Sequence, residues 1–188
     1  IDSESIGQGF CLSCQRLTSL SLGDEVDVIY GNAFQSTTAL TQVLDTNKVR
    51  EIGRYAFEYS AITGLTVHND LQLLKENVFM NKNLGTLDFT GTDVELCNET
   101  FKNAGLTSVN FGQTLSTIRN AVFADNNITE VSLPKSLRNI GVGVFVRNPL
   151  DTMTINFDIA ALNGGSPSPA RIMFSGSAVN TSPSRADD

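Results

Sequence analysis

The stretch that decides the fold is residues 50–67, REIGRYAFEYSAITGLTV, which contains two apolar patterns in succession. Its second half carries Ile62, Leu65 and Val67 and ends in an alternation of apolar and polar residues. That alternation is typical of a strand with one buried face. We therefore predict a short strand in this half.

The first half of the stretch has a different spacing. Ile52 stands four residues before Ala56 and five before Phe57. This spacing suits a single helical or 3₁₀ turn laid over a core. One turn is not stable alone, so we expect it to pack against neighbouring copies.

The same pattern recurs along the chain at intervals of 22 to 24 residues. In the first copy the residue five positions after the apolar Ile6 is Cys11 and not Phe10, so Cys11 takes the phenylalanine position there. Such a fixed period is typical of repeat proteins. The phenylalanine column consists of Phe10, Phe34, Phe57, Phe79, Phe101, Phe123 and Phe145.

About seven repeats of 22–23 residues fill the chain from Ile6 to Ile155. Each exposes an apolar side that it cannot bury alone, so the repeats must stack. We predict a β-rich solenoid with a parallel β-sheet and short helical or 3₁₀ turns. With strands about 4.8 Å apart, the sheet would be about 30 Å long. The core phenylalanines predicted to stack are Phe57, Phe79, Phe101 and Phe123.

The repeat resembles a known family. The pattern I-G-x-x-A-F, then L-x-x-V-x-L-P-x-x-L and the next I-G, is similar to the BspA-like, or Treponema pallidum-type, leucine-rich repeats. The best matches are IGRYAF at residues 52–57 and ITEVSLPKSLRNIG at residues 128–141. The resemblance implies a leucine-rich-repeat solenoid. It also implies a secreted or surface-anchored protein of bacteria or some protists, several of which are implicated in adhesion to host matrix proteins or other cells.

Two positions depart from the regular pattern. The family often carries Cys three residues after the Phe, but this chain keeps it only at Cys14, so a thiol ladder is not expected. Leu44 and Asp45 invert the usual polar and apolar order, which predicts a bulge or register change there. The other residues of the Cys column are Thr37, Ser60, Lys82, Ala104, Asn126 and Asn148.

The three cysteines have two possible arrangements. We expect Cys11 and Cys14 to be buried or half-buried thiols, with a local bridge between them as the alternative. Cys97 lies four repeats away, about 19 Å at the strand spacing. That exceeds the reach of a disulfide.

The chain divides into three segments. Residues 1–160 are predicted to form the solenoid, and no polar cap precedes it, so we expect further repeats before residue 1. Residues 161–180 form a turn-rich C-terminal closing segment in which Arg171 to Phe174 offer one more strand. Residues 181–188 are predicted to be a flexible tail.

Charge and hydropathy exclude two classes of partner. The net charge is −7, from 13 Lys and Arg against 20 Asp and Glu, so no nucleic-acid binding is expected. The longest apolar stretch, residues 140–146, has seven residues and contains two glycines. A membrane span needs roughly 20, so we expect no membrane insertion.

Residues of the types used in catalysis and metal binding are scattered along the sequence. His68 is the only histidine and occupies a turn after a strand. No residue in register with His68 could complete a metal site or serve as a nucleophile beside it. No nucleophile motif, phosphate loop or placed pair of carboxylates occurs. We therefore expect no enzyme activity, no catalytic residue, no metal and no cofactor.

What remains is the surface formed by the outward strand positions. These positions are small and polar, without the aromatic and Arg anchors of tight interfaces. We predict a monomeric, extracellular or cell-surface module that binds a protein, which the resemblance suggests is a host matrix or cell-surface protein. A passive spacer and an accessory domain of a larger secreted enzyme are the alternatives. The candidate binding face comprises Thr66, Asp88, Asn110, Ser132, Thr86, Ser108 and Glu130.

Overall fold

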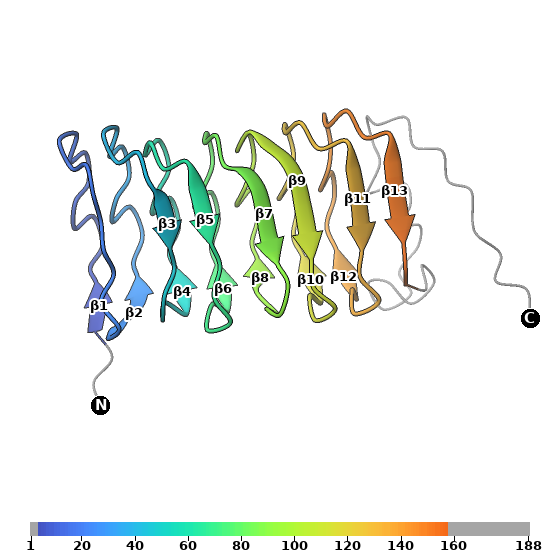
Figure 1. Cartoon of the computed structure of the whole chain (residues 1–188), viewed down its shortest axis with the longest axis horizontal. Coiled ribbons are helices and arrows are strands. Elements are labelled where there is room, and N and C mark those ends of the chain that lie inside the picture. Colours follow the sequence, from blue (N-terminus) through green and yellow to red (C-terminus); the bar gives the residue numbers. More distant parts are fainter. Residues whose placement is uncertain (1–3, 158–188) are drawn as a thin grey trace, which may run out of the picture.

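The protein is a β-solenoid of about seven turns in the computed structural model, which describes residues 4–157. Figure 1 shows the repeats stacked side by side in chain order, with strands in two layers. No helix occurs in the described range. The predicted repeat solenoid is confirmed, whereas the closing segment at 161–180 and the tail at 181–188 lie outside the described residues.

One layer is a continuous parallel sheet of seven strands, called here the seven-stranded sheet. Its strands end in an apolar residue that is buried in every strand except β1, as Ile52 and Ile118 show, and a more exposed residue precedes it on the outer side. In sheet order the strands are β1 (Glu4–Ile6), β2 (Val26–Ile29), β4 (Glu51–Ile52), β6 (Leu73–Leu74), β8 (Glu95–Leu96), β10 (Thr117–Ile118) and β12 (Asn139–Ile140).

The other layer consists of three parallel strand pairs. The strand predicted in residues 62–67 is β5, and its Leu65 is buried opposite Leu44 of β3. The predicted parallel sheet is present, but its seven continuous strands end at the apolar residue five positions before the phenylalanine position, such as Ile52, whereas the described strands of this second layer pair two by two. The pairs are β3 (Val43–Asp45) with β5 (Gly64–Thr66), β7 (Gly85–Phe89) with β9 (Leu106–Phe111), and β11 (Glu130–Leu133) with β13 (Thr152–Ile155).

The helical turn predicted between Ile52 and Phe57 is absent from the described chain. Tyr55 and Tyr59, two residues before and after Phe57, have positive φ angles of 59° and 53°. Left-handed residues cannot continue a right-handed helix, so the segment becomes a series of tight turns. Both positions recur in every repeat, as Gly9, Asn32, Tyr55, Asn77, Glu99, Ala121 and Gly143, and as Ser13, Ser36, Tyr59, Asn81, Asn103, Asp125 and Arg147.

The turns of successive repeats are joined by backbone hydrogen bonds. The amide of Phe57 donates to the carbonyl of Val78 at 3.2 Å, and the amide of Phe101 donates to that of Val122 at 3.0 Å. These bonds satisfy backbone groups that a helix would otherwise pair internally. The turn side is therefore a third wall of the solenoid.

The core between the walls contains the predicted phenylalanine stack. Neighbouring rings from Phe34 to Phe145 lie 5.2–5.8 Å apart with interplanar angles of 1–14°. A second, shorter stack of Phe89 and Phe111 meets Phe101 and Phe123 edge to face at 5.9 and 5.6 Å. The prediction of a stacked column is confirmed.

A mostly polar column runs beside this stack, three residues after the phenylalanine position, with Ala104 as its apolar member. The Thr37 and Ser60 hydroxyls donate to the carbonyls of Phe34 and Phe57 at 2.8 and 2.7 Å. Asn126 makes the same contact with Phe123 at 3.0 Å. Because each of these polar side chains caps the turn of its own repeat, the column holds the turn wall to the core.

Asn126 and Asn148 also join neighbouring repeats. The Asn126 side-chain oxygen accepts from the amides of Ala104 and Leu106, both at 3.0 Å, and its nitrogen donates to the carbonyl of Phe101 at 2.9 Å. Asn148 accepts from the Ile128 amide at 3.0 Å in the same way. One buried amide thereby satisfies backbone groups of two repeats.

Lys82 is the charged member of this polar column. Its ammonium donates to the carbonyl of Ser60 at 2.6 Å, and burial lowers the pKa of Lys82 to about 7, an effect partly offset by Glu58. Below about pH 7 the folded and unfolded chains both carry this proton, and the folded chain bears the full cost of burying the charge. Between pH 7 and the ordinary value of 10.5, only the unfolded chain retains the proton, so stability rises with pH.

We therefore expect Lys82→Met to be more stable than the parent at pH 6. The advantage should shrink by pH 9, because the parent then folds without a buried charge. Urea unfolding of both proteins at pH 6, 7.5 and 9 measures the difference, on the order of a few kcal/mol at pH 6. An advantage that stays the same at all three pH values would contradict the burial of a charged Lys82.

Candidate binding face

The structure places the predicted candidate residues together on the outer side of the strand pairs. Thr66 lies on β5, Thr86 and Asp88 on β7, Ser108 and Asn110 on β9, and Glu130 and Ser132 on β11. Six of them are exposed and Ser108 is half-buried, because alternate residues of each strand point outward. The strand register places Thr86 opposite Ser108, and Asp88 opposite Asn110.

Four of the seven candidate residues line one shallow groove. The groove has a volume of about 400 Å³ and lies across β9, β11 and β13. Thr66, Thr86 and Asp88 lie outside it. Its lining consists of Ser108, Val109, Asn110, Glu130, Val131, Ser132, Thr152 and Thr154.

Asp88 is held in a fixed orientation at the end of its strand. Its Oδ1 atom accepts hydrogen bonds from the amide and hydroxyl of Thr90 and from the side chain of Asn110. The Thr90 hydroxyl, followed by the Thr90 amide and Asn110, holds the pKa of Asp88 below its usual range. The face therefore presents an ionised, oriented carboxylate at neutral pH.

Sequence reasoning missed Asp45 as a member of this face. Counting 22 residues back from Thr66 points to Leu44, but Leu44 pairs with Leu65 and is buried, so Asp45 pairs with Thr66 and is exposed. The inverted order of the two residues was the available signal. The pairing within β3 and β5 is regular, so the register change precedes the strand.

His68 is exposed, as the sequence predicts for a turn residue. Its Nε2 atom lies 2.7 Å from Oδ1 of Asp45. No group of three His, Cys, Asp or Glu side chains within residues 4–157 could hold a metal ion.

A second groove, not anticipated from the sequence, lies on the outer side of the seven-stranded sheet. It has a volume of about 730 Å³ across β8, β10 and β12. Arg119 pairs there with Glu95 at 2.6 Å. Burial is the main cause that raises the pKa of the half-buried Cys97, so this thiol stays protonated and weakly nucleophilic at neutral pH.

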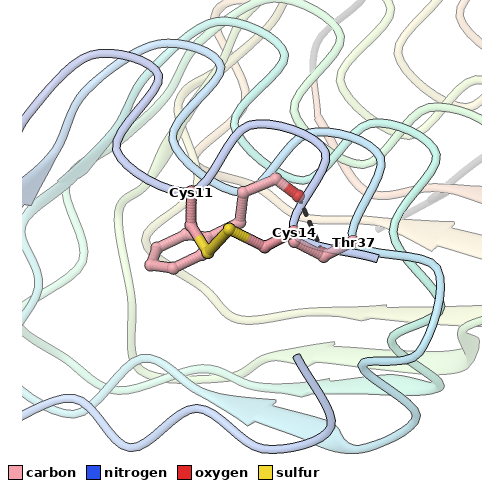
Figure 2. Close-up of a disulfide and its surroundings, with 4 residues drawn as sticks. Cys11, Cys14 and Thr37 are labelled. Atoms are coloured by element: carbon pink, nitrogen blue, oxygen red, sulfur yellow. Dashed lines mark hydrogen bonds between the residues drawn. A yellow bond between two sulfur atoms is a disulfide. The ribbon is translucent and has the colours of Figure 1, made fainter. Parts of the chain in front are cut away.

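Cys11 and Cys14 form a disulfide, which overturns the expectation of two free thiols. Figure 2 shows the bridge beside Thr37 of the next repeat. Cys11 occupies the phenylalanine position and Cys14 the polar column, and their Cα atoms are 5.3 Å apart on one tight turn. In later repeats a side chain of the polar column closes this turn by donating a hydrogen bond to the phenylalanine carbonyl. In the first repeat the disulfide takes that place.

Comparison with known families gives a match over most of the chain. The family described as BspA type leucine rich repeat region, in six copies, matches residues 4–126 and 50–166. No curated protein sequence matches the chain significantly. Within residues 4–157, no helix is long and apolar enough to cross a membrane.

Several solved structures have the same fold. A leucine-rich cell surface protein from Faecalibacterium prausnitzii is 24% identical, with a TM-score of 0.68 over 82% of this chain and 43% of that one. The pneumococcal vaccine antigen PcpA is 19% identical, with a TM-score of 0.53 over 81% and 48%. A leucine-rich repeat protein from Bacteroides ovatus is 17% identical, with a TM-score of 0.53 over 88% and 52%. The chain thus spans about half the length of these proteins.

Proposed function

Because the chain belongs to the BspA-type leucine-rich repeat family, we propose that it is a protein-binding or adhesion module. The observation that carries this proposal is the extended polar face on the strand pairs, where four candidate residues border one groove. A flat, repetitive surface favours contact with another macromolecule over capture of a small molecule. The partner we propose is a host matrix protein or a protein of another cell.

An extracellular or cell-surface location fits this role. The fold is shared with a bacterial cell surface protein and with a pneumococcal vaccine antigen. The bridge between Cys11 and Cys14 is of a kind that persists in oxidising compartments outside the cytosol. Both observations support secretion or display on a surface.

Single contacts on this face should be weak. The seven candidate residues are Thr, Ser, Asn, Asp and Glu, whereas Trp, Tyr and Arg supply most of the energy of tight interfaces. We expect a dissociation constant in the micromolar range or weaker for one copy, by order of magnitude.

Lysine substitutions on the face test where binding occurs. Each of Thr66→Lys, Asp88→Lys, Asn110→Lys and Ser132→Lys should abolish binding to a responsive member of a panel of purified extracellular-matrix proteins. The added side chain blocks close approach and changes the charge. Surface plasmon resonance measures binding, and circular dichroism checks that each variant keeps its fold.

Thr117→Lys and Asn139→Lys are the matched controls, because both residues line the groove on the seven-stranded sheet. These two variants should bind like the parent. Loss of binding in the controls, with retention in the four face variants, would place the binding site in the other groove. No binding by the parent to any matrix protein tested would count against the adhesion role.

A further inference from the structure

Most ion pairs of the described solenoid lie away from the strand-pair face, and the pair of His68 with Asp45 is the exception. On the outer side of the seven-stranded sheet, acids of one repeat are paired with bases of a neighbouring repeat. On the turn side, the carboxylates of Glu99 and Asp125 pair with Lys102 and Arg147. The pairs beside the seven-stranded sheet include Glu51–Lys75 at 2.5 Å, Arg54–Glu76 at 3.4 Å and Glu95–Arg119 at 2.6 Å.

The strand-pair face has acids without such bases. Asp45, Asp88 and Glu130 are exposed on β3, β7 and β11, and no outward position of the described strands in this layer is Lys or Arg. Asp45 has His68 as its partner, while Asp88 and Glu130 form no ion pair within residues 4–157. This face therefore carries a net negative charge.

The two carboxylates without ion pairs are available to a partner. All the hydrogen bonds that Asp88 accepts end on Oδ1, so Oδ2 retains its capacity to accept. Glu130 borders the groove of about 400 Å³. Two strand spacings and a two-residue offset separate these residues, a distance of about 12 Å.

We propose that the partner of this face is a cationic, extended protein segment. The proposal rests on the proposed function and specifies its ligand. An extended chain advances about 3.3 Å per residue and its side chains alternate between two faces, so basic residues four positions apart share a face and span about 13 Å, close to the separation of Asp88 and Glu130. Lys or Arg side chains supply the counter-charge that the face lacks, and both can bind carboxylates directly.

A decalysine peptide is the probe, because it offers basic residues at every spacing. The double variant Asp88→Asn with Glu130→Gln removes both charges and retains the side-chain shapes. We expect it to bind decalysine roughly five- to tenfold more weakly than the parent, since each exposed ion pair contributes modestly. Isothermal calorimetry at low salt measures the affinity, and added salt should weaken it.

The matched control is Glu51→Gln with Glu95→Gln on the seven-stranded sheet, which changes the net charge by the same amount. It should bind decalysine like the parent. Equal weakening in both double variants would show a general effect of net charge and overturn the proposal. A second outcome would separate the two proposals. If the Asp88→Asn, Glu130→Gln double variant binds decalysine as tightly as the parent, while the lysine variants lose matrix binding, the cationic partner is wrong and the proposed function stands.

Discussion

Replacing Phe101 with alanine should lower the free energy of unfolding by about 3–5 kcal/mol. The ring is fully buried, stacks on Phe79 at 5.4 Å and on Phe123 at 5.8 Å, and meets the edge of Phe89. Because each repeat is stabilised mainly by its neighbours, the damage should spread to the repeats on both sides. Urea unfolding and the thermal midpoint measure the loss.

Phe10→Ala is the matched control for this change. Phe10 belongs to the same sequence column, but it is 73% exposed and occupies the small-residue position before Cys11. Its removal should cost about 1 kcal/mol or less. An unchanged thermal midpoint in the Phe101 variant would contradict the stacked core.

Replacing Asn126 with alanine should cost about 3 kcal/mol or more. The side chain is buried, accepts from the amides of Ala104 and Leu106, and donates to the carbonyls of Phe101, Phe123 and Ala124. Alanine removes the partner of the Ala104 and Leu106 amides and of the Phe101 carbonyl, and each such group costs about 1–3 kcal/mol. The carbonyls of Phe123 and Ala124 keep the Asn148 side chain and the Asn103 amide as donors. Urea unfolding gives the total.

Hydrogen exchange locates the damage, since the amides of Ala104 and Leu106 should exchange faster in the Asn126 variant. Asn127→Ala is the control, because Asn127 is the adjacent residue and its side chain is exposed. We expect that change to alter stability by less than about 0.5 kcal/mol. Equal stability of the two variants would mean that Asn126 does not join the repeats.

The phenylalanine stack was predictable because one residue type repeats in one position. The turn wall was not, because the spacing from Ile52 to Ala56 equals that of a helical turn. What prevents the helix is the left-handed backbone at positions such as Tyr55 and Tyr59. Tyrosine gives no sign of that conformation, although the asparagines and glycines of the same columns favour it.

The polar column was hidden for a different reason. Thr37, Ser60 and Asn126 look unrelated in sequence, yet each donates to the carbonyl of the phenylalanine three residues earlier. The shared feature is hydrogen-bonding capacity and not residue identity, so a search for a cysteine or asparagine ladder overlooks it. The disulfide of Cys11 and Cys14 serves the same turn by covalent means.

The candidate face was predicted more completely, because alternation along a strand fixes which residues point outward. All seven predicted residues lie on it, and only the shift at Leu44 concealed Asp45. Their association into a groove depends on how β9, β11 and β13 lie beside one another, which a single repeat does not reveal.

The central claim, attachment through many weak contacts on the strand-pair face, is tested most directly by measuring affinity against valency. Surface plasmon resonance should compare the monomer with a clustered form on the same immobilised matrix protein. We predict a micromolar or weaker dissociation constant for the monomer, and apparent affinity roughly 10²–10⁴-fold higher for the cluster. A nanomolar monomer, or a cluster that binds no more tightly than the monomer, would contradict this account.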